Sequence, residues 1–402
     1  MDHRYKRRLS KQRGAALVVI AASLIVLVGV TGLALDLGHA YLNLSRLQSA
    51  VDATALSAAK TLNDTQDTVR AQDDGQDTFQ NFLVGEMGSA GLNPVYQFSD
   101  NYFPFVPGGA NPSYVRVRVS NFSMPVWLAR VLPGVGNTQT VGTSAVAGPS
   151  PPLGTGPNGQ ACDLAPVVMC GDPADTDCSD GNCYGYNMGA EEEVELKTNT
   201  ASSNDWETGS GNFQLIQLGC GPGANCLRDA LAGGATQCAF NENTVTTKPG
   251  NNVGPVAQGF NTRFGMYQGA GMNPSDYPPD TVTYHAPGYW HSDYEYNMSN
   301  GNMDYYPIAD GGIGVPHRRI MAVPFGNCTG TANGQGEVEV LGFGCFFMTR
   351  PASHQGNTQS LYGQFIEDCA ASGQSAENPG GPAGGPILYK IILYKDPLNQ
   401  WS

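Results

Sequence analysis

The stretch GAALVVIAASLIVLVGVTGLALDLGHAYLNLSRLQSAVDATALSAAKTL, residues 14–62, decides how this chain is organised. Residues 14–35 carry no charged side chain, and a helix of that length spans about 33 Å, slightly more than the hydrocarbon core of a bilayer. Six basic side chains and one acidic side chain precede this segment, in residues 1–13. Positive residues near a membrane helix stay in the cytoplasm. We therefore predict a single membrane crossing with the N-terminus inside and the rest of the chain outside.

A cleaved signal peptide is the alternative interpretation of this segment, but it would have a shorter apolar run of about 7–15 residues. The helical pattern also continues past residue 36. Steps of three and four residues separate most of the apolar positions there, which predicts one buried helix face. These positions are Leu37, Tyr41, Leu44, Val51, Ala55, Ala58 and Leu62. We therefore expect a retained anchor whose helix extends into a folded domain.

The same residues resemble a known family. The basic leader, the run RGAALVV, the pair Asp36 and Gly38 and the small-residue run at 50–59 are similar to the N-terminus of TadE/TadG-like proteins. These proteins take part in bacterial Flp (tight adherence) pilus assembly. The ending SAVAG at 144–148 and several C-terminal phrases, such as GFNTRF and GFGCFFM, make the chain closest to TadG-like members. The resemblance implies an assembly protein of the inner membrane whose partners are other Tad/Flp proteins, contacted through the N-terminal helix.

The sequence of residues 36–148 predicts a pilin-like unit, in which a long helix packs on a small antiparallel sheet. Helical character continues over 63–88, where Gly75 can interrupt it, and residues 114–119 alternate with the period of a strand. Strands are also expected at 95–98 and 138–147, with a short helix at 124–131. The fold class is therefore α+β, with a β-rich, disulfide-bonded domain after the pilin-like unit.

A Pro/Gly-rich linker at 149–160 separates the pilin-like unit from the second domain, 161–402. Short strands are expected there at 165–169, 194–198, 213–218, 320–325, 336–349, 361–367 and 387–395, with one short helix at 226–231. The final strand is expected to pair within this domain. All ten cysteines lie in it, and their even number without zinc-type spacing predicts disulfides formed outside the cytoplasm. They are Cys162, Cys170, Cys178, Cys183, Cys220, Cys226, Cys238, Cys328, Cys345 and Cys369.

Signals of catalysis are weak. No zinc-protease, phosphate-loop or serine-hydrolase motif occurs, and the six histidines are scattered. We therefore expect no enzyme, no catalytic residue, no cofactor and no small-molecule substrate. An acidic loop at 172–180 leaves a structural calcium ion open, although it does not fit an EF-hand. Its carboxylates belong to Asp172, Asp175, Asp177 and Asp180.

Two functions fit these observations. The first is a membrane-anchored, non-enzymatic component of Flp pilus assembly or its secretion apparatus. The alternative is a surface adhesin that uses the Tyr/Trp-rich region at 264–306, although aromatic side chains that pack on the sheet would give the same pattern. The net charge of −14 argues against nucleic acid as a partner. A cleaved pilin usually carries Glu five residues after the cut, whereas this position after Gly14 is Val19, so we expect Gly14 to stay joined to Ala15.

Overall fold

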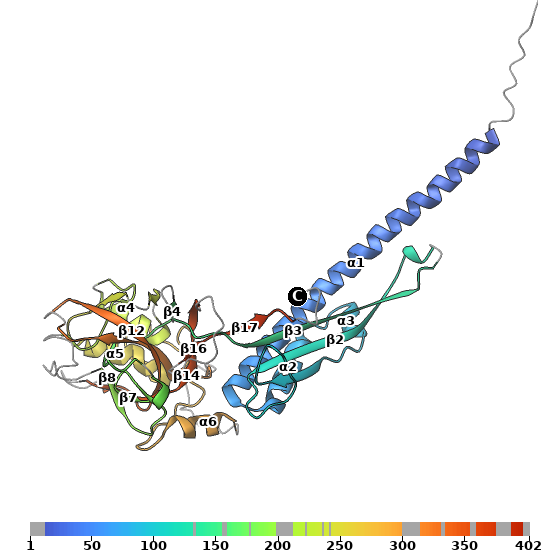
Figure 1. Ribbon diagram of the computed structural model, residues 1–402. Coiled ribbons are helices and arrows are strands. Elements are labelled where there is room, and N and C mark those ends of the chain that lie inside the picture. The colour runs from blue at the N-terminus through green and yellow to red at the C-terminus, as the bar shows by residue number, and fades with distance from the viewer. Residues whose placement is uncertain are drawn as a thin grey trace, which may run out of the picture. The chain divides into compact units, whose positions relative to one another are not determined.

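The structure is a computed structural model. It describes residues 13–131, 134–154, 159–176, 178–197, 212–221, 223–234, 237–240, 243–299, 314–330, 334–353, 359–374 and 387–396. The chain divides into two compact units (Figure 1). The first unit is Met1–Gly148 with Ile392–Ser402, and the second unit is Pro149–Ile391. The predicted α+β class is confirmed, with a long apolar helix, an antiparallel sheet and a β-rich unit that contains disulfides.

One helix, α1 (Arg13–Thr65), runs through the whole predicted anchor and beyond it for 53 residues (Figure 1). No proline or helix-ending signal interrupts this sequence, and its alanine and leucine residues favour a helix. One face of α1 is buried in the first unit after residue 36. Its members include Ala40, Leu47, Ala50, Val51, Ala55, Ala58, Ala59 and Leu62. The predicted continuation of the anchor into a domain helix is therefore confirmed, but Leu37 and Tyr41 of the predicted buried face are exposed.

A second helix, α2 (Thr68–Asn81), packs against α1. Asp67 caps it, because its side chain accepts hydrogen bonds from the backbone N–H groups of the second and third residues that follow. Gly75 does not interrupt this helix, contrary to the expectation. A Cβ at Gly75 would lie 2.9 Å from the ring of Tyr96 and 3.1 Å from the Cβ of Ala58. Glycine therefore permits the close approach of α2 to its neighbours. A short helix, α3 (Glu86–Ser89), follows.

The sheet of the first unit has the strand order β1-β2-β3-β17. Its strands are β1 (Val95–Ser99), β2 (Tyr114–Pro125), β3 (Thr138–Pro149) and β17 (Ile391–Tyr394). The first three pair antiparallel. The predicted helix at 124–131 is wrong except for a three-residue turn, η1 (Ala129–Val131). Alternate residues Phe122, Met124 and Val126 are buried there, so the apolar run follows the period of a strand.

The C-terminal strand corrects a second expectation. Residues 387–395 were expected to pair within the second domain, but they form two strands in two different sheets. Strand β16 (Ile387–Tyr389) pairs in the second unit, whereas β17 joins the sheet of the first unit. Asp396 follows β17 and is fully buried, with its carboxylate 3.1 Å from the Arg116 guanidinium. The Ser144 hydroxyl donates to the same carboxylate at 2.5 Å. This buried ion pair ties the returning chain to the sheet.

The main sheet of the second unit has the order β5-β11-β12-β13-β8, with β10 also pairing with β12. Its long central hairpin joins β11 (Ile320–Asn327) and β12 (Glu337–Met348) antiparallel. The other members are β5 (Met169–Cys170), β8 (Val194–Lys197), β10 (Thr244–Thr246) and β13 (Leu361–Ile366). Phe325, Phe346 and Phe365 pack their rings together on this sheet and are fully buried.

Smaller pieces complete the second unit. They are β4 (Gln160–Cys162), β6 (Asn182–Cys183), β7 (Tyr186–Asn187), β9 (Ala239–Phe240), β14 (Asp368–Ala370), β15 (Ser372–Gln374), and the 3-10 turns η2 (Cys178–Asp180) and η3 (Asn261–Phe264). The predicted short helix is α4 (Ala224–Gly233), but two further helices, α5 (Val253–Phe260) and α6 (His291–Ser299), were not expected. Residues 213–218 form isolated bridges and no strand.

The ten cysteines form five disulfides, all in the second unit, and none of them is free. The pairs are Cys162–Cys238, Cys170–Cys328, Cys178–Cys183, Cys220–Cys226 and Cys345–Cys369. The first and second pairs join positions 76 and 158 residues apart in the sequence. The described part of the first unit, in contrast, is held together without a covalent cross-link.

Candidate functional site

The candidate site lies where the apolar part of α1 ends, at Asp36. The carboxylate of Asp36 accepts three backbone hydrogen bonds from the turn that follows β2. The donors are the N–H groups of Trp127, Leu128 and Ala129, at 3.1, 3.0 and 2.5 Å. Asp36 is only 7% exposed. The aspartate that carried the family resemblance thus has a structural task, because it fixes the end of the β2–β3 hairpin to the anchor helix.

A second layer of contacts surrounds Asp36. One turn along α1, the ring of His39 stacks on the indole of Trp127 with centroids 4.3 Å apart. The Nε2 atom of His39 lies 3.0 Å from the carboxylate of Glu86 in α3. Asn43 bonds to both of these side chains, at 2.9 Å to His39 and 3.3 Å to Glu86. We call Asp36, His39, Asn43, Glu86 and Trp127 the exit cluster.

Three segments far apart in the sequence meet in the exit cluster: α1, α3 and the β2–β3 hairpin. Sequence reasoning found Asp36 alone, and it missed the other four residues. The signal that could have found one of them is a large aromatic residue, Trp127, two positions after the last residue of β2. Glu86 and Asn43 carry no such signal, because their pairing depends on how α3 returns to the helix.

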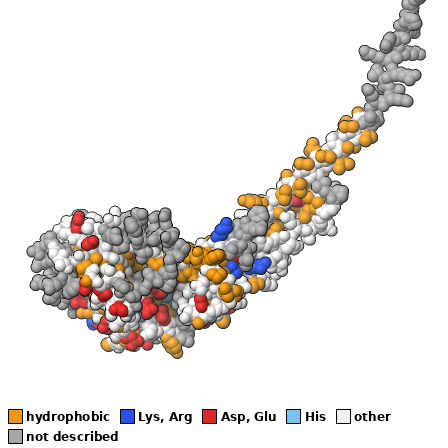
Figure 2. Space-filling view, viewed as in Figure 1, with side chains coloured by type: hydrophobic (Ala, Val, Ile, Leu, Met, Phe, Trp, Pro, Cys, Tyr) orange, Lys and Arg blue, Asp and Glu red, His pale blue; other side chains and the backbone are white. Residues whose placement is uncertain are grey.

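The described part of α1 from residue 16 to Asp36 is apolar and, apart from Gly29 and Gly32, exposed up to residue 35. Every residue from 16 to 28 is exposed, and Leu24, Val26 and Leu27 are each at least 60% exposed. Figure 2 shows apolar side chains, in orange, along the helix. Within the described residues, α1 is the one helix long and apolar enough to cross a membrane, by length and composition. The basic leader, apart from Arg13, lies outside the described residues, so the orientation stays a prediction.

The Tyr/Trp-rich region separates into a core part and a surface part. Tyr289 and Tyr294 are buried, as expected for aromatic packing on the sheet, and Tyr294 donates to Asp280 at 3.1 Å. Trp290 and His285 instead line a pocket of about 420 Å³ in the second unit. Its other lining residues are Glu193, Ala286, Pro287, Gly288 and Arg350. The end of the predicted adhesive region, 300–306, lies outside the described residues.

A fully buried arginine, Arg319, lies beside these aromatic residues, and sequence reasoning missed it. Its guanidinium is 4.7 Å from the ring centroid of Phe264 and 4.4 Å from that of Phe347. It donates to the carbonyl oxygens of Met348 at 2.7 Å and Tyr284 at 2.7 Å. Burial lowers the pKa of Arg319 to about 10. These bonds join several segments of the second unit, so Arg319 stabilises the fold.

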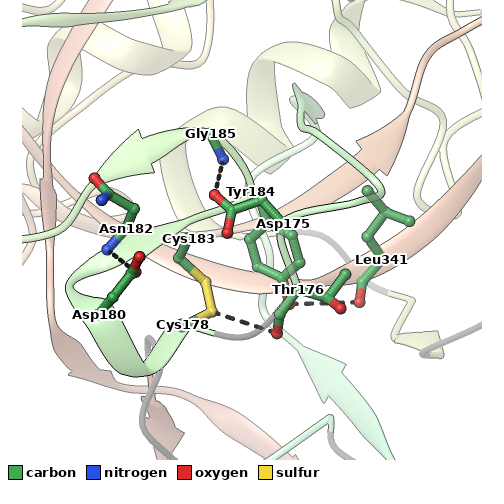
Figure 3. The surroundings of a disulfide bond; sticks show 9 residues. All are labelled: Asp175, Thr176, Cys178, Asp180, Asn182, Cys183, Tyr184, Gly185 and Leu341. Carbon is green, nitrogen blue, oxygen red and sulfur yellow. Dashed lines mark hydrogen bonds between the residues drawn. A yellow bond between two sulfur atoms is a disulfide. The ribbon is translucent and has the colours of Figure 1, made fainter.

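The acidic loop uses its carboxylates locally (Figure 3). Asp175 accepts from the N–H of Gly185 at 2.8 Å, and Asp180 accepts from that of Asn182 at 2.9 Å. Asp172 accepts in the same way from the residue two positions later. Asp177 lies outside the described residues. Among the residues that the structure describes, no group of three or more His, Cys, Asp or Glu side chains could hold a metal ion. A calcium ion at 172–180 stays an untested expectation.

The comparison with known protein families gives a match, which covers the anchor and the helix that continues from it. Residues 14–61 match the model of a family described as putative Flp pilus-assembly TadE/G-like. This match confirms the predicted resemblance for the anchor and its helical continuation, and it supports involvement in Flp pilus assembly. No curated protein and no solved structure matches the chain.

Proposed function

We propose that this protein is a membrane-anchored, non-enzymatic, TadG-like component of Flp pilus assembly. The observation that carries the proposal is the division of α1 into two parts. Residues 16–28 expose apolar side chains, whereas the helix beyond Asp36 buries one face in the first unit. The uncharged segment 14–35, which contains these residues, is long enough to cross a bilayer as a helix, while its continuation is stable only against a folded domain.

The basic leader supports an N-terminus in the cytoplasm, and the disulfides support an oxidising location for the second unit. We therefore place α1 in the inner membrane as a single crossing, with both units outside the cytoplasm. The partners are other Tad/Flp assembly proteins, which contact the exposed part of α1. Nucleic acid and small-molecule substrates are not part of this function.

Protease treatment of spheroplasts tests the topology. We expect the protease to degrade both units and to leave a fragment of about the length of residues 1–36. Lysed cells, in which the leader is also exposed, serve as the control. A second unit that stays intact in spheroplasts and is cleaved after lysis would contradict the proposal.

Assembly itself is tested by deleting the gene and counting pili, with complementation by the full chain. We expect loss of assembled pili, and restoration by the wild-type chain. N-terminal sequencing of the membrane-extracted protein then separates an assembly component from a fibre subunit. A chain that begins at Ala15 would contradict the assembly role and favour a minor pilin.

A second candidate function, surface adhesion, is favoured by the pocket beside Trp290. The Arg350 guanidinium lies 2.9 Å from Glu193 at this pocket and 3.9 Å from the ring centroid of Tyr362. A half-buried tryptophan beside exposed charged groups can bind sugars or peptides. A glycan array with Pro149–Ile391 is the test, with Trp290→Ala as the variant and Tyr296→Ala, an exposed tyrosine of α6, as the control. Binding that only Trp290→Ala abolishes would favour adhesion.

A further inference from the structure

The end of the β2–β3 hairpin reaches along α1 to a level within the apolar segment. We call residues 126–130 and 134–137 the hairpin tip. A Cβ at Gly32 would lie 2.8 Å from the Cβ of Leu128, so the tip touches the helix there. Gly32 precedes Asp36 by one helical turn, or about 6 Å along the axis. A helix from Gly14 to Gly32 spans about 28 Å, close to the thickness of the hydrocarbon core, so a core that ends near Gly32 places the tip at the level of the headgroups.

The side chains of the hairpin tip suit the boundary of a bilayer. Trp127, Leu128 and Val135 are 50%, 43% and 37% exposed, although all three are large and apolar. Arg130 is also exposed at the tip. Tryptophan concentrates at membrane interfaces, and arginine there reaches phosphate groups while its carbon chain stays among apolar neighbours. The adjacent part of α1 exposes Leu33 and Leu35 as well.

Several backbone N–H groups of the tip have hydrogen-bond partners within the protein, as an environment poor in water requires. An N–H group without a partner costs several kcal/mol in hydrocarbon. The N–H groups of Trp127, Leu128 and Ala129 all donate to Asp36. The N–H of Val126 donates to the carbonyl of Asn137 at 2.9 Å. Asp36 thus satisfies three donors at the point where the turn would otherwise need water.

We propose that the hairpin tip inserts into the headgroup region of the bilayer that α1 crosses, on the side where the first unit lies. The occupant of the exposed apolar surface is phospholipid, because this surface continues directly from the lipid-facing part of α1. The first unit is then held to the membrane at two points, the helix and the tip. Asp36 is the positioning residue that couples them. This inference rests on the proposed membrane anchoring.

Lipid quenching of tryptophan fluorescence tests the proposal with the full chain in phosphatidylcholine–phosphatidylglycerol vesicles. Trp206→Phe, Trp290→Phe and Trp401→Phe together leave Trp127 as the single tryptophan. We expect brominated lipids to remove most of the emission of Trp127, and aqueous acrylamide to have little effect. A matched chain that keeps only Trp290, in the second unit, should show the opposite behaviour. Comparing each chain with and without bromine removes the effect of the stacked His39 ring.

A third chain separates failure of this inference from failure of the anchoring. It carries Leu24→Trp as its single tryptophan, with Trp127→Phe added to the other replacements. If brominated lipids quench Leu24→Trp but not Trp127, the helix is in the bilayer and the tip inference is overturned. If neither is quenched, the anchoring on which it rests fails. Asp36→Ala should reduce quenching of Trp127 and leave that of Leu24→Trp unchanged, and unaltered quenching of Trp127 would overturn the positioning role.

Discussion

The two units of this protein reach stability in different ways. The first unit has no cysteine and is built from a long helix on an antiparallel sheet, and the buried Arg116–Asp396 ion pair joins two of its segments. The second unit has five disulfides, and many of its strands have only two or three residues. Short strands bury little apolar surface each, so cross-links compensate by restricting the unfolded chain. The comparison indicates two ways to offset the conformational entropy that a chain loses on folding. One is long helices and strands that bury more apolar surface, and the other is covalent cross-links.

Removal of the disulfide with the largest sequence separation should have the largest effect. The double replacement Cys170→Ser with Cys328→Ser opens a link between residues 158 apart. The chain-entropy account predicts a loss of about 5 kcal/mol for such a loop, confined to the second unit. Hydrogen–deuterium exchange of the full chain, resolved by peptide, measures the two units separately.

The matched control is the double replacement Cys178→Ser with Cys183→Ser, whose cysteines are 5 residues apart. The same account predicts a loss of about 2 kcal/mol. Equal losses from the two double variants, or faster exchange throughout the first unit, would contradict the proposed difference between the units.

Breaking the buried ion pair should produce the next largest effect, and in the first unit. Asp396→Ala leaves Arg116 buried without this carboxylate and removes an acceptor of the Ser144 hydroxyl. Breaking a buried pair typically costs about 3–5 kcal/mol. We expect β17 and its neighbour β3 to exchange faster, while the second unit keeps its rate. Asp64→Ala, which removes a partner of Lys60 at the surface, is the control and should cost about 0.5 kcal/mol. Similar costs for both would contradict the role of Asp396.

Low pH should lower the free energy of unfolding of the second unit, because His291 binds a proton more readily in the unfolded chain. Burial, with further effects of His317 and Arg319, lowers the pKa of His291 to about 4, while Glu295 lies 3.6 Å away and favours the charged form. The unfolded chain binds this proton near pH 6.5. The contribution is therefore fully present above pH 6.5 and is lost as the pH falls toward 4, by about 3 kcal/mol in total.

Urea unfolding at pH 7 and pH 5 measures this acid effect. His291→Phe keeps an aromatic ring beside Phe347 and removes the titrating group. We expect its stability to fall less between the two pH values than that of the wild-type chain. An unchanged pH dependence in the variant would show that other groups cause the acid sensitivity.

The sequence alone determined the features that depend on local pattern. The uncharged run at 14–35 and the apolar face beyond it specify α1, because a helix places residues three and four apart on one side. The period-two pattern of valine at 114–119 specified β2, because a strand places alternate residues on the same face. The confinement of all ten cysteines to one region predicted a disulfide-bonded unit, although it left the pairs open. The sequence showed Asp36 as part of the family resemblance, but it did not show which groups this side chain contacts.

Tertiary structure decided what depends on residues distant in the sequence. It brought β17 to the sheet of the first unit, because the match of Asp396 with Arg116, 280 residues away, is not encoded in any local period. It gave Asp36 three N–H partners from a turn more than ninety residues later. It also buried Arg319 among aromatic rings, where carbonyl oxygens from separate segments satisfy its donors. Such pairings are fixed by the three-dimensional meeting of surfaces, so a single sequence read along its length cannot show them.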